Sequence, residues 1–450
     1  MLYSSVLQSF CSAVKISALP LTCKQGINVN FVNMWQIIYY LGVKCYSLLI
    51  RIMALFNPKA KKWVNGRWNL FTKLRNAIPD HKPVVWFHCA SLGEFEQGRP
   101  LIETYRKKNP NHFILLTFYS PSGYEIRKDY TGADAVFYLP QDSPSNARMF
   151  LDIVNPQKVF FIKYEFWYYY IHAIHKRQIP FYMVSAIFRE SQVFFKPWGS
   201  FFRKILKKVT WFFVQDENSA NLLQSIGIEA YTISGDTRFD RVLELAGKPA
   251  KLHGVDEFIQ NQPVFIAGST WPKDESIILD QIDVFCRQGW KVLLVPHEVE
   301  ETHIRQIISK IPSDIKYASY SDDTSKWQGA DILIVNKIGL LSGLYQYASL
   351  AYIGGGFGKG IHNILEAATY SLPVIFGPHH KQFKEAVDLL RIGGAFSIEG
   401  EHDFIPLLKR FLDQPTMREK AGSIARQYVE QHSGATSAIL SHMDASGSKK

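Results

Sequence analysis

Short and nearly continuous apolar runs alternate with amphipathic stretches along most of the chain from about residue 83. In the first half these runs are VVWFHCA (84–90), HFILLTF (112–118), AVFYLP (135–140), KVFFIKY (158–164), PFYMVSA (180–186) and WFFVQD (211–216). Runs of this length are typical of strands buried on both faces, and helical patterns such as those at 94–107 and 217–226 follow most of them. Buried strands separated by helices predict a doubly wound parallel α/β sheet.

The alternation pauses over 243–263, where polar residues, Gly and Pro accumulate, and then begins again. The second series comprises VFIAGST (264–270), WKVLLVPH (290–297), DILIVN (331–336), LAYIGGG (350–356) and PVIFGP (373–378). We therefore predict two doubly wound Rossmann-like domains, over 57–246 and 263–442, joined by a linker over 247–262. The second domain ends in helices, and a frayed tail follows over 443–450. Ligands bind beyond the carboxyl ends of such strands, so the domains are expected to face a cleft that holds the site.

One segment near the N-terminus, MWQIIYYLGVKCYSLLIRIMALF (34–56), is long and apolar enough to predict a membrane anchor. A dense basic run follows it and places that end on the cytoplasmic side; its members are Lys59, Lys61, Lys62, Arg67, Lys73 and Arg75. Lys44 and Arg51 interrupt the segment, so a helix buried at the edge of the first domain stays open as the alternative. Residues 1–33 show no pattern and are an unassigned leader.

The net charge of +11 requires an anionic partner. The positive charge is concentrated directly after the apolar segment, and this placement favours an anionic membrane surface as the partner. Nucleic acid is disfavoured because the sequence carries no nucleic-acid-binding motif. Apolar residues make up 47% of the chain and charged residues 20%, and these values exclude wholesale disorder. The 5 cysteines are scattered without metal-binding spacing, which favours a reducing compartment.

The stretch HCASLGEFEQGRP (88–100) follows the first predicted strand and carries the candidate catalytic residue. Ser91 and Gly93 are expected to form the turn, which places Glu94 in the first turn of the next helix. A carboxylate at the mouth of a cleft can act as a general base and remove a proton from an acceptor hydroxyl. The helix dipole alone also favours a carboxylate there, so a purely structural role for Glu94 stays open.

A second candidate site lies in GGGFGKGIHNILEAATYSLPVIFGP (354–378), where a strand runs into a glycine-rich loop and then a helix. Backbone amides at a helix N-terminus bind anions, and glycine lets a phosphate approach closely; the glycines concerned are Gly354, Gly355, Gly356 and Gly360. His362 and Glu366 have the i, i+4 spacing that places them on one helix face, with Asn363 beside them. We expect this face to hold a nucleotide, with Glu366 on the ribose hydroxyls. A plain glycine turn before a capped helix is the alternative.

Two further strand ends carry polar residues. In AGSTWPKDES, Ser269 and Thr270 either cap the following helix or bind phosphate in the same geometry. In KYEFWYYY, Glu165 either contacts a sugar or belongs to a core aromatic helix. The acidic pair Asp322–Asp323 falls in a polar loop and no zinc spacing is present, so we expect a metal-independent transfer that needs no cofactor.

Taken in order, these motifs resemble those of the transferases that attach 3-deoxy-manno-octulosonic acid (Kdo) to a lipid A precursor. The resemblance runs from about Met34 through the last helices. The corresponding segments are SLGE (91–94) for the family's S-x-G-E, FYSPSGYE (118–125) for T-x-T-P-T-G, YLPQD (138–142) for P-x-D, Glu165 with Trp167 for E-x-E-x-W, GDTRFD (235–240) for G-N-x-K-F-D, GSTWPKDE (268–275) for S-T-H-x-G-E-E and GGGFGKGIHNILE (354–366) for G-G-S…G-G-H-N-x-x-E.

The resemblance implies a two-domain GT-B glycosyltransferase whose first domain binds the acceptor and whose second domain binds the nucleotide sugar. It implies CMP-Kdo as donor, the lipid A precursor lipid IVA as acceptor and Glu94 as general base. The implied donor site comprises Ser269, Thr270, Pro296, His297, Gly354, Gly355, Gly356, Gly360, His362, Asn363 and Glu366, and the implied acceptor cleft comprises Ser91, Gly93, Glu165 and Arg189. The protein is expected on the cytoplasmic face of the inner membrane, held on anionic lipid by the N-terminal segment.

The chain departs from the family's pattern in places. The family's P-R-H reads P-H-E over 296–298, so an arginine near the donor is missing, and its D-x-x-G-E-L reads N-K-I-G-L-L over 336–341, which loses a carboxylate. Its N-A-R-x-S reads S-A-I-F-R over 185–189, and Lys337 or Arg189 is expected to substitute. Two alternatives stay open: another GT-B transferase or an epimerase that uses a UDP- or GDP-sugar, and a catalytically silent membrane-bound module that binds nucleotide or lipid.

Overall fold

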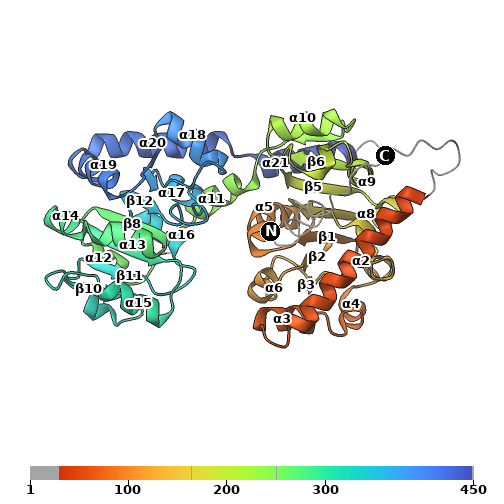
Figure 1. Ribbon diagram of the computed structural model, residues 1–450, viewed down its shortest axis with the longest axis horizontal. Coiled ribbons are helices and arrows are strands. Elements are labelled where there is room, and N and C mark those ends of the chain that lie inside the picture. Colours follow the sequence, from red (N-terminus) through yellow and green to blue (C-terminus); the bar gives the residue numbers. More distant parts are fainter. Residues whose placement is uncertain (1–29, 164, 250, 448–450) are drawn as a thin grey trace, which may run out of the picture. The chain divides into compact units, whose positions relative to one another are not determined.

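The structure, a computed structural model, describes residues 30–163, 165–249 and 251–447. The chain forms two compact units. The first contains the chain up to Thr237 together with the residues from Gly434 onward, and the second contains Arg238–Ser433. Each unit is an α/β body built on a seven-stranded parallel sheet (Figure 1). The predicted fold class of two doubly wound α/β domains is therefore confirmed.

The first sheet has the strand order β3-β2-β1-β4-β5-β6-β7. Its strands are β1 (Val84–Cys89), β2 (Phe113–Phe118), β3 (Ala135–Tyr138), β4 (Lys158–Ile162), β5 (Phe181–Ala186), β6 (Trp211–Val214) and β7 (Tyr231–Ile233). The direction of strand addition reverses between β1 and β4, which pair in parallel. The loops that follow these two strands therefore leave at a switch point, where open α/β sheets bind their ligands.

Successive residues of β1 face opposite sides of the sheet, so Trp86 lies in the core on one face and Phe87 in the core on the other. Helix α5 and the last helix α21 cover the Phe87 face, and the remaining long helices contribute to the Trp86 face. The helices of this unit are α2 (Asn30–Met53), α3 (Pro58–Asn65), α4 (Leu70–Ala77), α5 (Leu92–Lys108), α6 (Pro121–Arg127), α7 (Pro144–Val154), α8 (Tyr168–Lys176), α9 (Ser200–Leu206), α10 (Glu217–Ser225) and α21 (Ala435–Gly447).

The second sheet has the order β10-β11-β9-β8-β12-β13-β14, with its switch point between β8 and β12. Its strands are β8 (Val264–Thr270), β9 (Lys291–Pro296), β10 (Tyr317–Ser319), β11 (Ile332–Ile334), β12 (Leu350–Ile353), β13 (Val374–Phe376) and β14 (Ala395–Ser397). The helices around it are α11 (Thr237–Gly247), α12 (Val255–Ile259), α13 (Pro272–Leu279), α14 (Ile282–Arg287), α15 (Glu301–Ile308), α16 (Leu341–Leu344), α17 (Leu365–Ala368), α18 (Lys384–Ile392), α19 (Glu401–Asp413) and α20 (Pro415–Gln431).

The strands that the apolar runs predicted are all present, whereas β7, β10 and β14 were not predicted. Each of these is three residues long and lies at the edge of its sheet. An edge strand is covered on fewer sides than a central one, so its residues stay partly exposed and it does not need a continuous apolar run.

The boundary between the units differs from the predicted linker over 247–262. The division falls after Thr237, and α12 lies inside the second unit because its apolar side chains are buried in that core; these are Val255, Phe258 and Ile259. The predicted second domain also extended to residue 442, but α21 belongs to the first unit. Ile439 and Met443 of α21 are buried with the α5 face of the first sheet. Tertiary packing therefore places α21 in the first unit, although it follows the second unit in the sequence.

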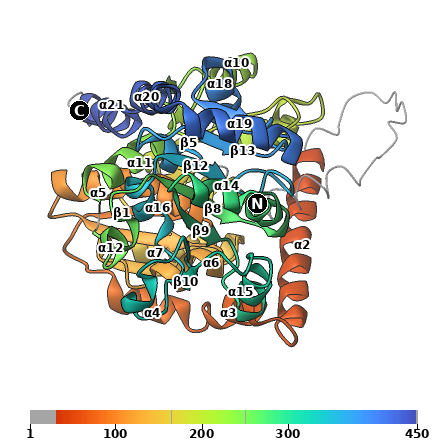
Figure 2. The same cartoon turned by 90° about the vertical axis from the view of Figure 1, so that its left-hand side faces the viewer.

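Helix α2 covers most of the predicted anchor over 34–56 and runs along the outside of the first unit (Figure 2). Tyr39 and Val43 are buried in the core of that unit, which corresponds to the alternative of a helix at the edge of the first domain. Within the ranges that the structure describes, no helix combines the length and the apolar character needed to cross a membrane. The spanning anchor is therefore not confirmed. The unassigned leader over 1–33 falls almost wholly outside the described residues.

Candidate functional site

The start of α5 holds Glu94 in place through a reciprocal cap. The Ser91 side chain accepts from the backbone N–H of Glu94 at 3.5 Å, and the Ser91 N–H donates to Oε2 of Glu94 at 3.0 Å. This capping box is a local feature of sequence, which is why the motif located it correctly. Gly93 lies inside the first turn of α5 and not in the preceding turn, because Ser91 is the cap. A Cβ at Gly93 would meet no atom within 4 Å, so there is open space at Gly93, the residue before Glu94.

Glu94 is 9% exposed, and its environment disfavours the charged form. Burial, followed by the nearby carboxyl of Glu165, raises the pKa of Glu94 to about 7 against the opposing effects of His88 and Lys163. A carboxyl whose pKa lies near neutrality is suited to take up a proton during a reaction at pH 7.

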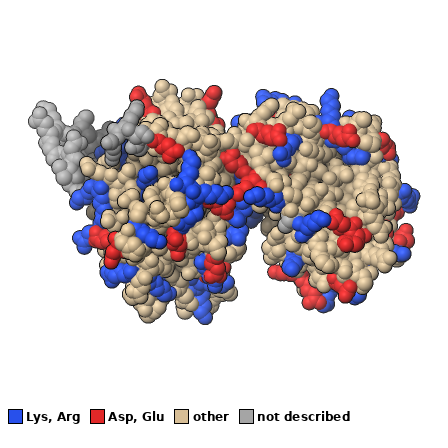
Figure 3. Space-filling view, turned by 180° about the vertical axis from the view of Figure 1, so that it is seen from behind, with Lys and Arg blue, Asp and Glu red and all other residues tan. Residues whose placement is uncertain are grey.

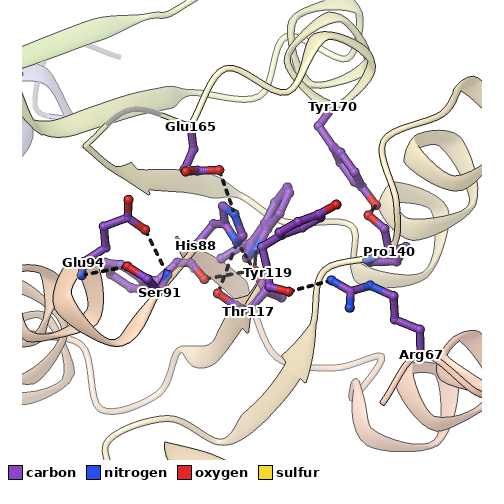
Figure 4. A network of polar contacts seen from close by, with 11 residues as sticks. Arg67, His88, Ser91, Glu94, Thr117, Tyr119, Pro140, Glu165 and Tyr170 are labelled. Carbon is purple, nitrogen blue, oxygen red and sulfur yellow. Dashed lines mark hydrogen bonds and ion pairs between the residues drawn. The ribbon is translucent and has the colours of Figure 1, made fainter. Parts of the chain in front are cut away.

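His88 joins Glu165 to Thr117 of β2 in the first sheet (Figure 4). Its Nδ1 lies 3.1 Å from the carbonyl oxygen of Thr117 and 2.9 Å from its Oγ1. Because a carbonyl oxygen only accepts, Nδ1 carries the ring hydrogen and Nε2 is left with a lone pair. Burial lowers the pKa of His88 to about 3, so the ring is neutral.

Glu165 follows β4 and precedes α8, so it stands in a loop and not in the aromatic helix that was the alternative. Its Oε2 lies 3.8 Å from Nε2 of His88. Burial raises the pKa of Glu165 to about 7, and a hydrogen bond from Trp167 opposes that rise. Two carboxyl groups with raised pKa therefore lie at the ends of neighbouring strands β1 and β4, as the switch-point argument predicts for a site.

Arg67 was grouped by sequence with the basic run that follows the apolar segment, and the structure corrects this. Its guanidinium donates to the carbonyl oxygens of Leu139 at 3.0 Å, Trp63 at 3.0 Å and Tyr119 at 2.9 Å. It also lies over the Trp63, Tyr119 and Tyr138 rings. Burial lowers the pKa of Arg67 to about 10. Arg67 therefore joins the segments that follow β2 and β3, and its donors are not directed at a membrane surface.

Arg189, predicted for the acceptor cleft, lies after β5 with an exposed side chain. Its backbone N–H donates to the side chain of Gln192 at 3.1 Å. Its guanidinium is thus at the surface of the first unit, and its predicted role stays a prediction.

In the second unit, Ser269 and Thr270 end β8. Ser269 adopts a left-handed conformation with φ of 54°, and Thr270 is fully buried. The Thr270 hydroxyl donates to Oε1 of Glu275 at 3.1 Å, and Nε2 of His303 lies 2.9 Å from the same oxygen. One alternative predicted that Ser269 or Thr270 caps α13, but neither residue does so. That position is taken by Trp271, whose N–H donates to Oδ2 of Asp274 at 2.9 Å.

Asp274 is the central buried group of this region, and sequence analysis missed it. It is 0% exposed, and its carboxylate accepts from Tyr352 Oη at 2.7 Å and from the Gly355 N–H at 3.0 Å as well as from Trp271. It therefore ties the start of α13 to the glycine loop after β12. A position three residues into a helix is the usual place for an acidic cap residue, and that signal was present in the sequence.

The glycine loop is shaped by close packing between neighbouring loops. A Cβ at Gly354 would lie 2.3 Å from the Ser269 carbonyl oxygen, and one at Gly356 would lie 2.6 Å from Cα of Gly377. Gly355 and Gly360 have φ of 90° and 141°, which side chains rarely adopt. These glycines therefore serve close packing, and the Gly355 N–H is already used by Asp274. Their predicted contact with a phosphate stays a prediction.

His362 lies in the loop before α17, and this corrects the predicted helix face. Helix α17 begins at Leu365 and is four residues long, so His362 and Glu366 do not share a helix. Asn363 joins the segment by donating from Nδ2 to Oε1 of Glu366 at 2.9 Å and by accepting from the Leu365 N–H at 3.2 Å.

Three aromatic rings stack beside this loop. The centroid of His297 lies 4.8 Å from that of Trp271 and 4.5 Å from that of His362. Trp271 Nε1 donates to Nε2 of His362 at 3.0 Å, so the His362 ring is protonated at Nδ1. Burial, followed by the neighbouring His297, lowers the pKa of His362. The predicted residues His297 and His362 are thus brought together, and Pro296, which ends β9, places His297 there.

Two α/β units, each with polar groups at the ends of its parallel strands, place the chain in the class of two-domain doubly wound α/β proteins. The UDP-GlcNAc 2-epimerase from Neisseria meningitidis matches 80% of this chain and 99% of its own, with a TM-score of 0.59 and 16% identity. A putative UDP-N-acetylglucosamine 2-epimerase from Listeria monocytogenes matches 82% of this chain and 98% of its own, with a TM-score of 0.58 and 13% identity. At these identities the likeness concerns the fold alone.

The sequence comparisons identify the family. The family described as 3-deoxy-D-manno-octulosonic-acid transferase (kdotransferase) matches residues 64–241. The 3-deoxy-D-manno-octulosonic acid transferase of Rickettsia bellii is 28% identical over 395 residues, covering 86% of this chain and 92% of that protein. That of Rickettsia felis is 30% identical over 339 residues, covering 74% and 72%. The chain belongs to the Kdo transferase family, as its motifs predicted, and is a glycosyltransferase of lipopolysaccharide biosynthesis.

Proposed function

We propose that the protein transfers Kdo from CMP-Kdo to the lipid A precursor lipid IVA, with Glu94 as the general base. The observation that carries the proposal is the position of Glu94. It is held at the start of α5 by Ser91, open space lies beside Gly93, and burial raises the pKa of Glu94 to about 7.

In the proposed reaction an oxygen of Glu94 removes the proton from a sugar hydroxyl of the acceptor. The hydroxyl oxygen then bonds to the anomeric carbon of Kdo, while the bond from that carbon to the CMP phosphate oxygen breaks and its electrons leave with CMP. The Ser91 N–H occupies Oε2 of Glu94 at 3.0 Å, so Oε1 is the oxygen proposed to face the acceptor. The proton passes to solvent after product release, and the scheme needs no metal ion or cofactor.

The donor is proposed to bind the second unit beside the ring stack. Nδ1–H of His362 is a donor suited to the CMP phosphate, because the Trp271 bond fixes the tautomer. Glu366, oriented by Asn363, is proposed to accept from the ribose hydroxyls. Ser269 and Thr270 are proposed to border the same site, and Lys337, exposed after β11, is proposed to replace the basic residue that the family places near the donor.

The proposed location is the cytoplasmic face of the inner membrane, on anionic lipid. Exposed apolar residues of α2 and the exposed lysines after it support this proposal; they are Ile37, Leu41, Leu48, Ile52, Lys59, Lys61 and Lys62. Apolar side chains beside basic ones are typical of helices that lie in a membrane interface. Figure 3 shows Lys and Arg side chains spread over the surface, consistent with the net charge of +11.

The deciding experiment is transfer by the purified protein from CMP-Kdo, generated in the reaction, to lipid IVA in detergent. Mass spectrometry is expected to show a product heavier by one or more Kdo units. The fold likeness to UDP-GlcNAc 2-epimerases favours a UDP-sugar as the second candidate donor. Calorimetry with CMP, UDP and GDP separates the two, and UDP binding without CMP binding would contradict the proposal. CMP binding without any transfer would support the alternative of a catalytically silent module that binds nucleotide.

A further inference from the structure

A hollow of about 380 Å³ lies on the first unit where α2, α8 and α9 meet. Its polar lining is basic: His172 and His175 come from α8, and Lys204, Lys207 and Lys208 come from α9 and the residues that follow it. We call this feature the basic hollow. It involves neither Glu94 nor the ring stack, so the site described above does not account for it.

The charges of the basic hollow are not balanced by acidic side chains. In the described ranges, none of its lysines or histidines forms an ion pair. Asp142 accepts from the Tyr39 hydroxyl at 2.6 Å and from the backbone N–H groups of Tyr169 and Tyr170, and it is fully buried. Burial lowers the pKa of His172, and the nearby Lys208 and His175 lower it further. Like charges gathered around one space repel each other, and a bound anion removes that cost.

The lining of the hollow also includes the aromatic rings of Tyr168 and Phe201. Tyr168 stacks on Phe201 with centroids 5.1 Å apart and on His172 at 6.1 Å, and the Gln36 side chain bonds to its hydroxyl. The ligand that fits is therefore an anion attached to an apolar body. The same turns of α2 that supply Gln36 also expose large apolar side chains; Met34 is 41% exposed, Ile37 58% and Leu41 59%. One amphiphilic molecule could place its phosphate in the hollow and its acyl chains against α2.

We propose that the basic hollow binds the phosphate of an anionic lipid headgroup while the exposed apolar residues of α2 enter the adjoining acyl layer. The inference rests on the proposed action at a membrane surface and adds the place and the chemistry of attachment. The phosphate is that of a bilayer phospholipid. A free phosphate compound shares the same chemistry and is separated by the test.

The test compares two double variants of the full chain in flotation with phosphatidylcholine vesicles that contain phosphatidic acid. Lys204→Gln/Lys207→Gln removes charge from the hollow, and Lys107→Gln/Lys128→Gln removes the same charge from exposed positions elsewhere on the first unit. A lysine near an anionic surface contributes on the order of fivefold to binding, so the hollow variant is expected to bind about tenfold or more weakly. The control variant is expected to bind within about threefold of wild type, because its lysines lie outside the site.

Equal loss in both variants would mean attraction to overall charge and would overturn the proposal, as would no loss in the hollow variant. Titration with inorganic phosphate provides the second arm. Weak phosphate binding that the hollow variant abolishes supports the proposal, whereas tight phosphate binding without vesicle binding overturns it in favour of a soluble ligand. Melting temperatures check folding, and His175→Gln/Lys204→Gln replaces the first variant if that one unfolds. Wild-type transfer to detergent-solubilised acceptor tests the proposed function separately, since it needs no vesicle.

Discussion

Nε2 of His88 lies 3.8 Å from Oε2 of Glu165, and it has no hydrogen-bond partner in the described part of the chain. Nδ1 of the same ring donates to Thr117, so Nε2 presents a lone pair to the carboxyl. A lone pair and a carboxylate repel, whereas a protonated carboxyl can donate to the ring. We infer that Glu165 is the group that keeps a proton at neutral pH, which leaves Glu94 as the anionic base.

Glu94→Gln tests the base directly. The Gln side chain keeps an oxygen that accepts from the Ser91 N–H, so the cap of α5 and the fold are expected to persist. Turnover is expected to fall by a factor of about a hundred or more, because the proton acceptor is lost. Steady-state rates, melting temperature and CMP affinity by calorimetry are the measurements. A variant with the wild-type rate would remove Glu94 from the mechanism.

Glu165→Gln tests the assignment of the proton. The introduced glutamine would resemble the protonated carboxyl, since its amide can donate to Nε2 of His88, and substantial activity is expected to remain. Because the neutral glutamine stands in for a carboxyl that already carries a proton, the charge beside Glu94 does not change, and the pKa of Glu94 is expected to stay near 7. The acid limb of the kcat/KM profile is therefore expected to keep its position.

The sign of the stability change provides a control for this variant. The pKa of Glu165 is raised to about 7 in the folded state, so its contribution to stability is present below its unfolded pKa of about 4.3 and is lost as pH rises through 7. Glu165→Gln is expected to flatten this part of the stability curve, measured by urea unfolding across the pH range. Loss of activity together with a shift of the acid limb to lower pH would show that Glu165 acts as an anion.

Asp274→Asn tests the group that ties the glycine loop to α13. Asn keeps one acceptor oxygen but cannot satisfy the N–H groups of Trp271 and Gly355 together with the Tyr352 hydroxyl. A loss of about 1–3 kcal/mol in unfolding free energy is expected, with weaker CMP binding. Asp256→Asn, an exposed acid at the start of α12, is the matched control and is expected to change neither quantity. Unchanged CMP affinity in folded Asp274→Asn would place the donor elsewhere.

Glu366→Ala tests the proposed ribose contact. Unpaired hydroxyls in a closed site cost about 1–3 kcal/mol, which corresponds to about tenfold to hundredfold weaker CMP binding in calorimetry. Lipid binding, assigned to the first unit, is expected to be unchanged. The variant also removes the acceptor of the Asn363 amide, so Asn363→Ala is the companion variant. A lower melting temperature with CMP affinity preserved would indicate a structural role only.

Ile37→Ser/Leu41→Ser tests membrane association through α2. Both side chains are exposed, so the melting temperature is expected to change little while vesicle binding weakens. Deletion of 1–56 is a poorer test, because it removes Tyr39 and leaves the buried Asp142 without the Tyr39 hydroxyl. We expect that truncated protein to be destabilised. Unchanged vesicle binding by the double variant would place the membrane contact away from α2.

The sequence alone determined the two α/β units, their central strands and the cap that holds Glu94. These features are local. A continuous apolar run indicates a buried strand, and a Ser and a Glu three residues apart each accept a hydrogen bond from the other's backbone N–H. The edge strands escaped prediction because partial exposure leaves no continuous apolar run.

Only the tertiary structure decided which distant residues meet. His88 and Glu165 lie close because β1 and β4 are neighbours, and Asp274 reaches the Gly355 N–H because β8 lies beside β12. The same holds for α21, which packs on α5 although the second unit precedes it in the chain. The order of the strands and the packing of the C-terminal helix on the first unit depend on the free energy of the whole core. No short window of sequence contains that information.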